Sequence, residues 1–170
     1  MIHTVAVLVE NKPGALARVS NLFARRGFNI ESLAVGPTER PEVSRITLRV
    51  DCSLRTLEQI EKQMHKLVNV LRVTTLEAGE AVERELALVK VSAPPARRAE
   101  LMALGEVFRA RVADLGSDSM IFEVAGSPEE LEAFQELVRP HGLKELARTG
   151  RIGLGRASAA RSPRPQHVLR

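Results

Sequence analysis

The sequence predicts an α+β fold in which one order of elements, β-α-β-β-α-β, occurs twice in tandem. Short runs rich in valine and isoleucine alternate with stretches whose apolar residues recur every three or four positions. Glycine, proline and polar residues mark the turns of two predicted hairpins. A polar, acid-rich stretch, EAGEAVERE, separates the two halves. Each half therefore has the order of a ferredoxin-like domain.

The first predicted domain spans residues 1–77. A valine-rich strand, His3–Glu10, precedes a helix that begins after Gly14 and stops at Gly27, a common helix-ending residue. Helical spacing of apolar residues returns between Leu54 and Met64, which predicts the second helix. The other strands are predicted at residues 29–35, 43–50 and 67–76.

The second predicted domain, residues 85–157, repeats this order after a linker at 78–84. Ser127 is predicted to cap its last helix, with Pro128 at the first helical position and Glu130 three residues after the cap. An earlier helix is predicted at residues 99–109, with Leu101, Leu104, Val107 and Phe108 facing inward. Strands are predicted at residues 86–93, 111–116, 120–126 and 143–150.

The positive charge of the chain, +4 overall, is concentrated at its end. Residues 144–170 hold seven Lys or Arg and one acidic residue, whereas residues 1–143 hold 18 basic and 20 acidic residues. Residues 158–170 are predicted to be a basic flexible tail because they are rich in Ser, Pro and Arg. The Gly-rich stretch GLGRAS at 153–158 follows no good strand and opens no helix, so it is interpreted as loose. The folded part is close to neutral, which argues against nucleic acid as its partner.

Several functional classes lack their signals in this sequence. No apolar run approaches the roughly 20 residues that span a bilayer, and no signal peptide is recognised, so no membrane contact and a cytoplasmic location are expected. The single cysteine, Cys52, has no partner for a disulfide or a zinc site. The four histidines are scattered, and no nucleotide-binding or hydrolase motif is present. We expect no catalytic residues and no metal site.

The stretch NKPGAL, residues 11–16, is suited to bind a small zwitterion. The first turn of a helix carries unpaired N–H groups and the positive end of the helix dipole, so it attracts a carboxylate. Gly14 lets a ligand approach the N–H groups of Gly14, Ala15 and Leu16, while Asn11 offers an acceptor for an ammonium group. The alternative is that Asn11 only caps the helix and the Pro-Gly pair only makes a turn.

The segment LVENKPGALARVSNLFARRGFNIESLAV resembles the ACT domain that begins the small regulatory subunit of acetolactate synthase, also called acetohydroxyacid synthase. The resemblance continues through LEQIEKQMHKLVNVLRV and VERELALVKV. It covers about the first 90 residues closely and the C-terminal domain more loosely. RGFNIESL and QIEKQMHKLVNVLRV are specific to this subunit family, whereas other ACT domains share only the strand, the Pro-Gly turn and the helix.

The resemblance implies a non-catalytic subunit that binds and activates a catalytic large subunit and confers feedback inhibition by branched-chain amino acids, most often valine. Thiamine diphosphate, magnesium and FAD would be bound by the large subunit, and this chain would hold no cofactor. ACT domains pair side by side as a homodimer, with the effector between protomers. The implied effector-binding residues are Asn11, Gly14, Ala15 and Leu16 at the helix start, with Asn29 and Ile30 contributed from across the dimer interface.

An RNA-binding protein is the rival interpretation because RNA recognition motifs share the β-α-β-β-α-β order. That fold stacks bases on aromatic residues of its sheet. This chain has no Trp or Tyr and five Phe, three of them on predicted inner faces of helices. Only Phe28 and Phe122 are left as possible stacking residues, which favours the regulatory subunit.

Overall fold

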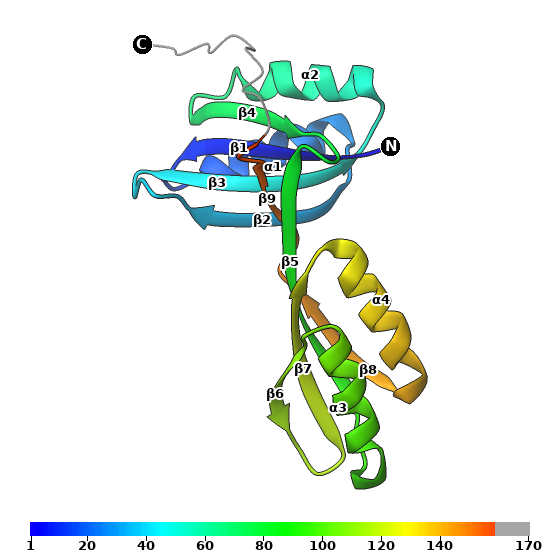
Figure 1. The fold of residues 1–170 in the computed structure, drawn as a ribbon. Coiled ribbons are helices and arrows are strands. Elements are labelled where there is room, and N and C mark those ends of the chain that lie inside the picture. The colour runs from blue at the N-terminus through cyan, green and yellow to red at the C-terminus, as the bar shows by residue number, and fades with distance from the viewer. Residues whose placement is uncertain (159–170) are drawn as a thin grey trace. The chain divides into compact units, whose positions relative to one another are not determined.

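The computed structural model describes residues 1–158, which form two compact units. Unit 1 contains Met1–Val82 and the described residues from Arg151 onward, and unit 2 contains Glu83–Gly150. Both units have the predicted β-α-β-β-α-β order and an antiparallel sheet, so the predicted fold class is confirmed (Figure 1). The basic tail predicted at residues 158–170 lies outside the described residues, except for its first residue.

Unit 1 is a four-stranded antiparallel sheet in the order β2-β3-β1-β4, with α1 and α2 packed on one face (Figure 1). Residues that alternate along the strands supply the core because successive strand side chains point to opposite faces. Val5, Val7 and Val9 of the first strand and Ile46 and Leu48 of the third are at most 2% exposed. The elements are β1 (Ile2–Glu10), α1 (Ala15–Arg26), β2 (Ile30–Pro37), β3 (Val43–Asp51), α2 (Leu54–Met64) and β4 (Val70–Leu76).

The C-terminal part of the described chain returns to unit 1, which the sequence analysis did not foresee. Residues 152–155 form a strand, β9 (Ile152–Gly155), which pairs with β5 (Ala81–Ser92), so the interpretation of 153–158 as loose is wrong for residues 153–155. Arg45, on the sheet face away from the helices, donates from Nη1 to the carbonyl of Gly153 at 3.4 Å. Arg156 donates its backbone N–H to the Glu80 carbonyl at 2.8 Å. Backbone pairing, which needs no particular side chains, makes this segment a strand.

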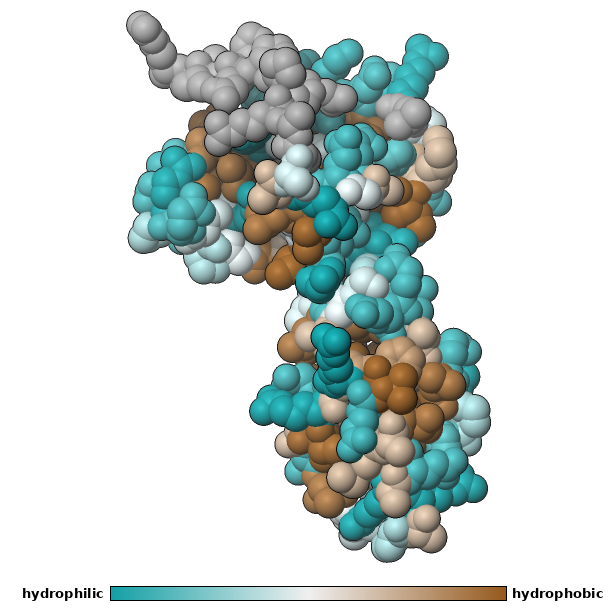
Figure 2. Space-filling view, in the orientation of Figure 1, coloured by the Kyte–Doolittle hydropathy of each residue, from teal (hydrophilic) through white to brown (hydrophobic). Residues whose placement is uncertain are grey.

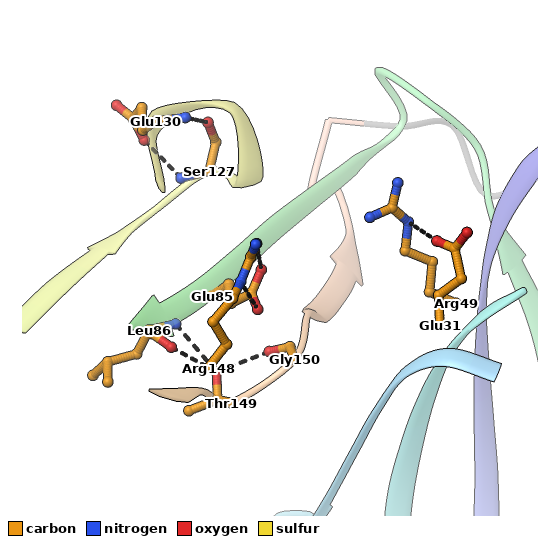
Figure 3. Close-up of polar contacts among 9 residues, drawn as sticks. All are labelled: Glu31, Arg49, Glu85, Leu86, Ser127, Glu130, Arg148, Thr149 and Gly150. Carbon is orange, nitrogen blue, oxygen red and sulfur yellow. Dashed lines mark hydrogen bonds and ion pairs between the residues drawn. The ribbon is translucent and has the colours of Figure 1, made fainter. Parts of the chain in front are cut away.

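Unit 2 repeats the topology with the strand order β6-β7-β5-β8, and α3 and α4 pack on one face. Ser127 caps α4 as predicted: its side chain accepts from the Glu130 N–H, and the Glu130 carboxylate accepts from the Ser127 N–H (Figure 3). The elements are α3 (Arg98–Val107), β6 (Arg111–Leu115), β7 (Ser119–Gly126), α4 (Pro128–Val138) and β8 (Leu143–Arg148), with short 3-10 turns η1 (Pro95–Arg97) and η2 (Arg139–His141).

Three details of the sequence analysis differ from the structure. The predicted linker at 78–84 is a strand from Ala81 onward, and it leads directly into the compact unit 2, Glu83–Gly150. Val107 is 75% exposed, not inward: it is the last residue of α3, and the buried residues of that helix are Leu101 and Gly105. Phe122 is buried in the core of unit 2 and Phe28 packs against that of unit 1, so these rings serve core packing.

The surface of both units mixes polar and hydrophobic side chains (Figure 2). Exposed hydrophobic residues include Val35 and Val68 in unit 1 and Met102 and Leu137 in unit 2. No helix within residues 1–158 is long and apolar enough to cross a membrane.

Candidate functional site

A hollow of about 130 Å³ lies in unit 1 where the core face of the sheet meets the first turn of α1. The C-terminal end of β1 and the neighbouring parts of β2 and β3 form its floor. Its apolar lining comes from Val9, Ala15, Leu16, Val35 and Ile46. Its polar lining comes from Glu10, Asn11, Lys12 and Ser44. The predicted stretch from residue 11 to 16 therefore borders a real depression in the molecule.

The start of α1 leaves backbone donors free beside this hollow. Gly14 is the N-cap, with φ 84° and ψ −7°, and a Cβ built on it would meet no atom within 4 Å. The Ala15 N–H reaches the Lys12 carbonyl at 3.3 Å, whereas the N–H groups of Gly14 and Leu16 have no acceptor among residues 1–158. Glycine is needed here because other residues rarely adopt this backbone conformation. The predicted donors at Gly14 and Leu16 are thus available to an anion.

The other helices use their own side chains at this position. Ser53 caps α2 and Ser127 caps α4, while α3 carries Glu100 in its first turn. Among the α-helices of the described chain, α1 alone has neither a side-chain cap nor an acidic residue in its first turn. The positive end of its dipole is therefore left for an anion from outside the chain.

Asn11 does not cap α1, so the part of the alternative interpretation that made it a helix cap is wrong. Its backbone N–H donates to the Glu42 carbonyl at 2.7 Å, and its side-chain Nδ2 donates to the Pro41 carbonyl at 2.9 Å. These bonds join the loop after β1 to the turn before β3. They fix the amide group and leave its oxygen as an acceptor at the edge of the hollow.

Glu10 also lines the hollow, and two neighbours hold its carboxylate. Asn69 donates from Nδ2 to Glu10 Oε2 at 2.7 Å, and Lys12 Nζ approaches Glu10 Oε1 at 3.2 Å. The hydrogen bond from Asn69, followed by that from Lys12, lowers the pKa of Glu10 below its ordinary value. The backbone N–H of Glu10 also donates to the Asn69 carbonyl at 2.9 Å, so two bonds connect the hollow to the start of β4.

Asn29 and Ile30 lie at the other end of the same sheet. Ile30 pairs with Val50, whereas Glu10, beside the hollow, pairs with Val43 at the opposite end of β3. Seven residues of strand, or about 23 Å, separate these positions. Asn29 is exposed and Ile30 is half-buried against the core. One chain brings Asn11, Gly14, Ala15 and Leu16 together but does not bring Asn29 or Ile30 to them.

The arrangement offers each part that a small amino acid needs. Free N–H groups suit its carboxylate, the Glu10 carboxylate and the Asn11 oxygen suit its ammonium, and Val9, Val35 and Ile46 suit an aliphatic side chain. No group of three or more His, Cys, Asp or Glu side chains in the described part of the chain could hold a metal ion.

Sequence reasoning missed residues that line the hollow, among them Glu10, Val35, Ser44 and Ile46. The alternation Ser44, Ile46, Leu48, Val50 places Ser44 on the core-facing side of β3. A lone polar residue on an apolar face was therefore a usable signal.

Comparisons with known proteins cover nearly the whole described chain. Residues 5–72 match the family model described as an AHAS small subunit-like ACT domain, and residues 84–157 match that of the small subunit of acetolactate synthase. A protein of Archaeoglobus fulgidus named "Probable acetolactate synthase small subunit" is 51% identical over 93% of this chain and 99% of its own. The acetolactate synthase small subunit of Mycolicibacterium smegmatis is 47% identical over 91% of each chain.

A solved structure gives the same result. The crystal structure of the acetolactate synthase small subunit from Thermotoga maritima aligns with a TM-score of 0.86 at 42% identity. That alignment covers 94% of this chain and 99% of the Thermotoga chain.

Proposed function

Because this chain belongs to the family of acetolactate synthase small subunits, we propose that it activates a catalytic large subunit and makes it sensitive to feedback inhibition by branched-chain amino acids, valine first. Acetolactate synthesis itself, with thiamine diphosphate, magnesium and FAD, is assigned to the large subunit. The small subunit then contributes the amino-acid site and the contact that transmits its occupancy.

One observation carries this proposal: the uncapped start of α1 opens onto a hollow with an apolar floor. The carboxylate of valine binds the N–H groups of Gly14 and Leu16, where the helix dipole favours negative charge. Its ammonium group faces Glu10 and Asn11, and its isopropyl group covers Val35 and Ile46. An ammonium group gains two acceptors here, Glu10 and the Asn11 oxygen, that a plain carboxylic acid could not use, so amino acids are the favoured class.

A homodimer through β2 would complete the site. In the described chain β2 is an edge strand of its sheet, paired only with β3. If two copies join β2 to β2 in antiparallel fashion about a two-fold axis, the Ile30 end of one strand lies beside the Pro37 end of the other. The hollow lies near that second end, at Val35. Such pairing brings Asn29 and Ile30 of one protomer to the Asn11 and Gly14 of its partner.

The binding free energy expected for valine suits a sensor of a metabolite pool. Burying an isopropyl group is worth about 1.5 to 2 kcal/mol. Two or three charge-assisted hydrogen bonds add about 1.5 to 3 kcal/mol each, less the cost of association. A net value near 6 kcal/mol corresponds to a dissociation constant of roughly tens of micromolar. Alanine, two carbons smaller than valine, would bind about fifteenfold more weakly, whereas one carbon changes affinity only about fourfold.

Inhibition follows if valine favours a dimer geometry that the active large subunit disfavours. Thermodynamic linkage then requires the active conformation of the large subunit to weaken valine binding by the same factor. Valine affinity measured with and without the large subunit tests this reciprocity.

The direct test is an assay of acetolactate formation by the large subunit, with and without this chain, across a valine titration. The chain is expected to raise the rate, and valine is expected to lower it again. Asn11→Ala and Asn29→Ala should abolish the valine response, because each removes a polar partner of the effector. Asn21→Ala is the matched control, since Asn21 is exposed in the middle of α1, away from the hollow.

Two results would contradict the proposal. A large subunit whose rate is indifferent to this chain would remove the regulatory role. If Asn11→Ala and Asn29→Ala both stayed as sensitive to valine as the parent and Asn21→Ala, the effector site would lie elsewhere.

A further inference from the structure

Ser44 ends a row of large aliphatic side chains on the core-facing side of β3. The core-facing residues of β3 are Val50, Leu48 and Ile46, each 0% exposed, and then Ser44. Ser44 lies opposite Val9 of β1 on one side and Pro37 of β2 on the other. The row thus ends in a small residue at the place where the hollow begins.

The Ser44 hydroxyl has no protein partner to explain its presence there. The residue is only 8% exposed, yet within residues 1–158 no group forms a hydrogen bond with its side chain. The hydroxyl oxygen stays accessible at the hollow that Ser44 lines, so water or a ligand there can be its partner. Its closest neighbours along the hollow, Val9 and Ile46, are apolar. The role of Ser44 therefore lies in the hollow and not in the packing of the unit.

We propose that Ser44 sets the size of the amino-acid side chain that the hollow admits, and so decides selectivity among aliphatic effectors. The inference rests on the proposed function, in which an amino acid binds at the start of α1. A larger residue at position 44 would continue the aliphatic row and fill part of the floor. One added methyl group would therefore take up part of a hollow of only about 130 Å³.

Ser44→Thr is the sharpest variant because it keeps the hydroxyl and adds one methyl group. Threonine also suits a strand, so the sheet should tolerate it. Leucine is one methylene longer than valine, so its affinity should fall more than that of valine when the added methyl group reduces the space in the hollow. In the assay with the large subunit, the ratio of the half-inhibitory concentration of leucine to that of valine should rise about fourfold or more.

Two companion variants separate size from hydrogen bonding. Ser44→Ala keeps the size and removes the hydroxyl, so the leucine-to-valine ratio should stay within about twofold of the parent. Ser44→Val replaces the hydroxyl by a second methyl group and should raise the ratio at least as far as Ser44→Thr. The thermal unfolding midpoint and the mass in solution of each variant establish that it is folded and assembled like the parent.

The outcomes distinguish this inference from the proposed function. If the parent is inhibited by valine but neither Ser44→Thr nor Ser44→Val changes the ratio, the size limit is set elsewhere and only the inference is overturned. A shift in Ser44→Ala as large as in Ser44→Thr would also overturn it, because the hydroxyl would then be what the effector contacts. A parent that no amino acid binds or inhibits would overturn the proposed function and this inference with it.

Discussion

Arg148 donates two hydrogen bonds to the carboxylate of Glu85, from Nε at 2.8 Å and from Nη2 at 2.6 Å (Figure 3). Glu85 is 5% exposed, whereas 29% of the Arg148 side chain is exposed. The hydrogen bonds to Glu85 raise the pKa of Arg148. Beside this pair, the Thr149 N–H donates to the Leu86 carbonyl at 3.0 Å, and the Leu86 N–H donates to Thr149 Oγ1 at 3.1 Å. These contacts join the first strand of unit 2 to its last.

Arg148→Met should destabilise unit 2 by about 3 kcal/mol, because it leaves the Glu85 carboxylate buried without a partner. Urea unfolding followed by circular dichroism measures the loss. Arg111→Met is the matched control: Arg111 also contacts a glutamate, Glu123, at 2.6 Å, but 72% of its side chain is exposed. That change should cost much less, because solvent screens an exposed ion pair. Equal losses of unfolding free energy in the two variants would show that the burial of Glu85 does not make its ion pair more important for stability.

Elements with a strong local signal were predicted well, and those made by distant pairing were not. The last helix of unit 2 was predicted to its first turn, because Ser127, Pro128 and Glu130 act within four residues of one another. The strand β9 was missed because its glycines favour no local structure and its partner strand is more than 60 residues away. Likewise, the acidic start of β5 looked like a linker, although backbone pairing makes it a strand.

In the candidate site, too, the features set by local sequence were predicted and those set by distant pairing were not. The start of α1 at Gly14 was predicted from local sequence, and a glycine there has no side chain that could cap the helix. Local sequence left open whether Asn11 caps it. The floor was not predicted, because Val35 and Ser44 reach the hollow only through the register of β2 and β3. Asn11 was expected at the site, but its bond to the Pro41 carbonyl depends on a turn 30 residues away.

Gly105→Ala should destabilise the chain although alanine is the better helix former. The added Cβ would lie 2.8 Å from Phe122 Cε1, closer than carbon atoms approach. Phe122 cannot easily move because it is 1% exposed and packs edge-on against Phe134, with ring centroids 5.5 Å apart. Overpacking of about 1 to 3 kcal/mol outweighs a helix-propensity gain of about 1 kcal/mol.

The net loss expected for Gly105→Ala is about 1 kcal/mol, measured by urea unfolding. Combining it with Phe122→Leu should give a double variant that loses less than the sum of the two single changes, because the shorter side chain leaves room for the methyl group. Additive losses would show that the two positions do not compete for space.

Gly14→Ala should cost stability and also weaken the valine response. A non-glycine residue at φ 84° is strained by about 1 to 2 kcal/mol. The new methyl group would meet none of the chain's own atoms within 4 Å, so it projects into space at the helix start. Gly79→Ala is the matched control, because Gly79 has the same φ of 84° and equally open surroundings but lies outside the hollow.

Both glycine variants should therefore lose similar stability in urea unfolding, but only Gly14→Ala should raise the half-inhibitory concentration of valine. If the half-inhibitory concentration of valine rose equally in Gly79→Ala, the cause would be strain in unit 1 and not a blocked approach of the effector.

Asn69→Ala should make the stability of the chain less dependent on pH in the acid range. The hydrogen bond from Asn69 lowers the pKa of Glu10, so its stabilising effect is present above the ordinary pKa of about 4.5 and is lost as pH falls through the lowered value. The variant should thus be less stable than the parent at pH 6, and the difference should narrow toward pH 3. An NMR titration should show the pKa of Glu10 rising toward its ordinary value in the variant, while Asn21→Ala leaves it in place. A stability difference that stays constant across this range would mean that Asn69 acts through packing, and that the Glu10 carboxylate owes its low pKa to Lys12 alone.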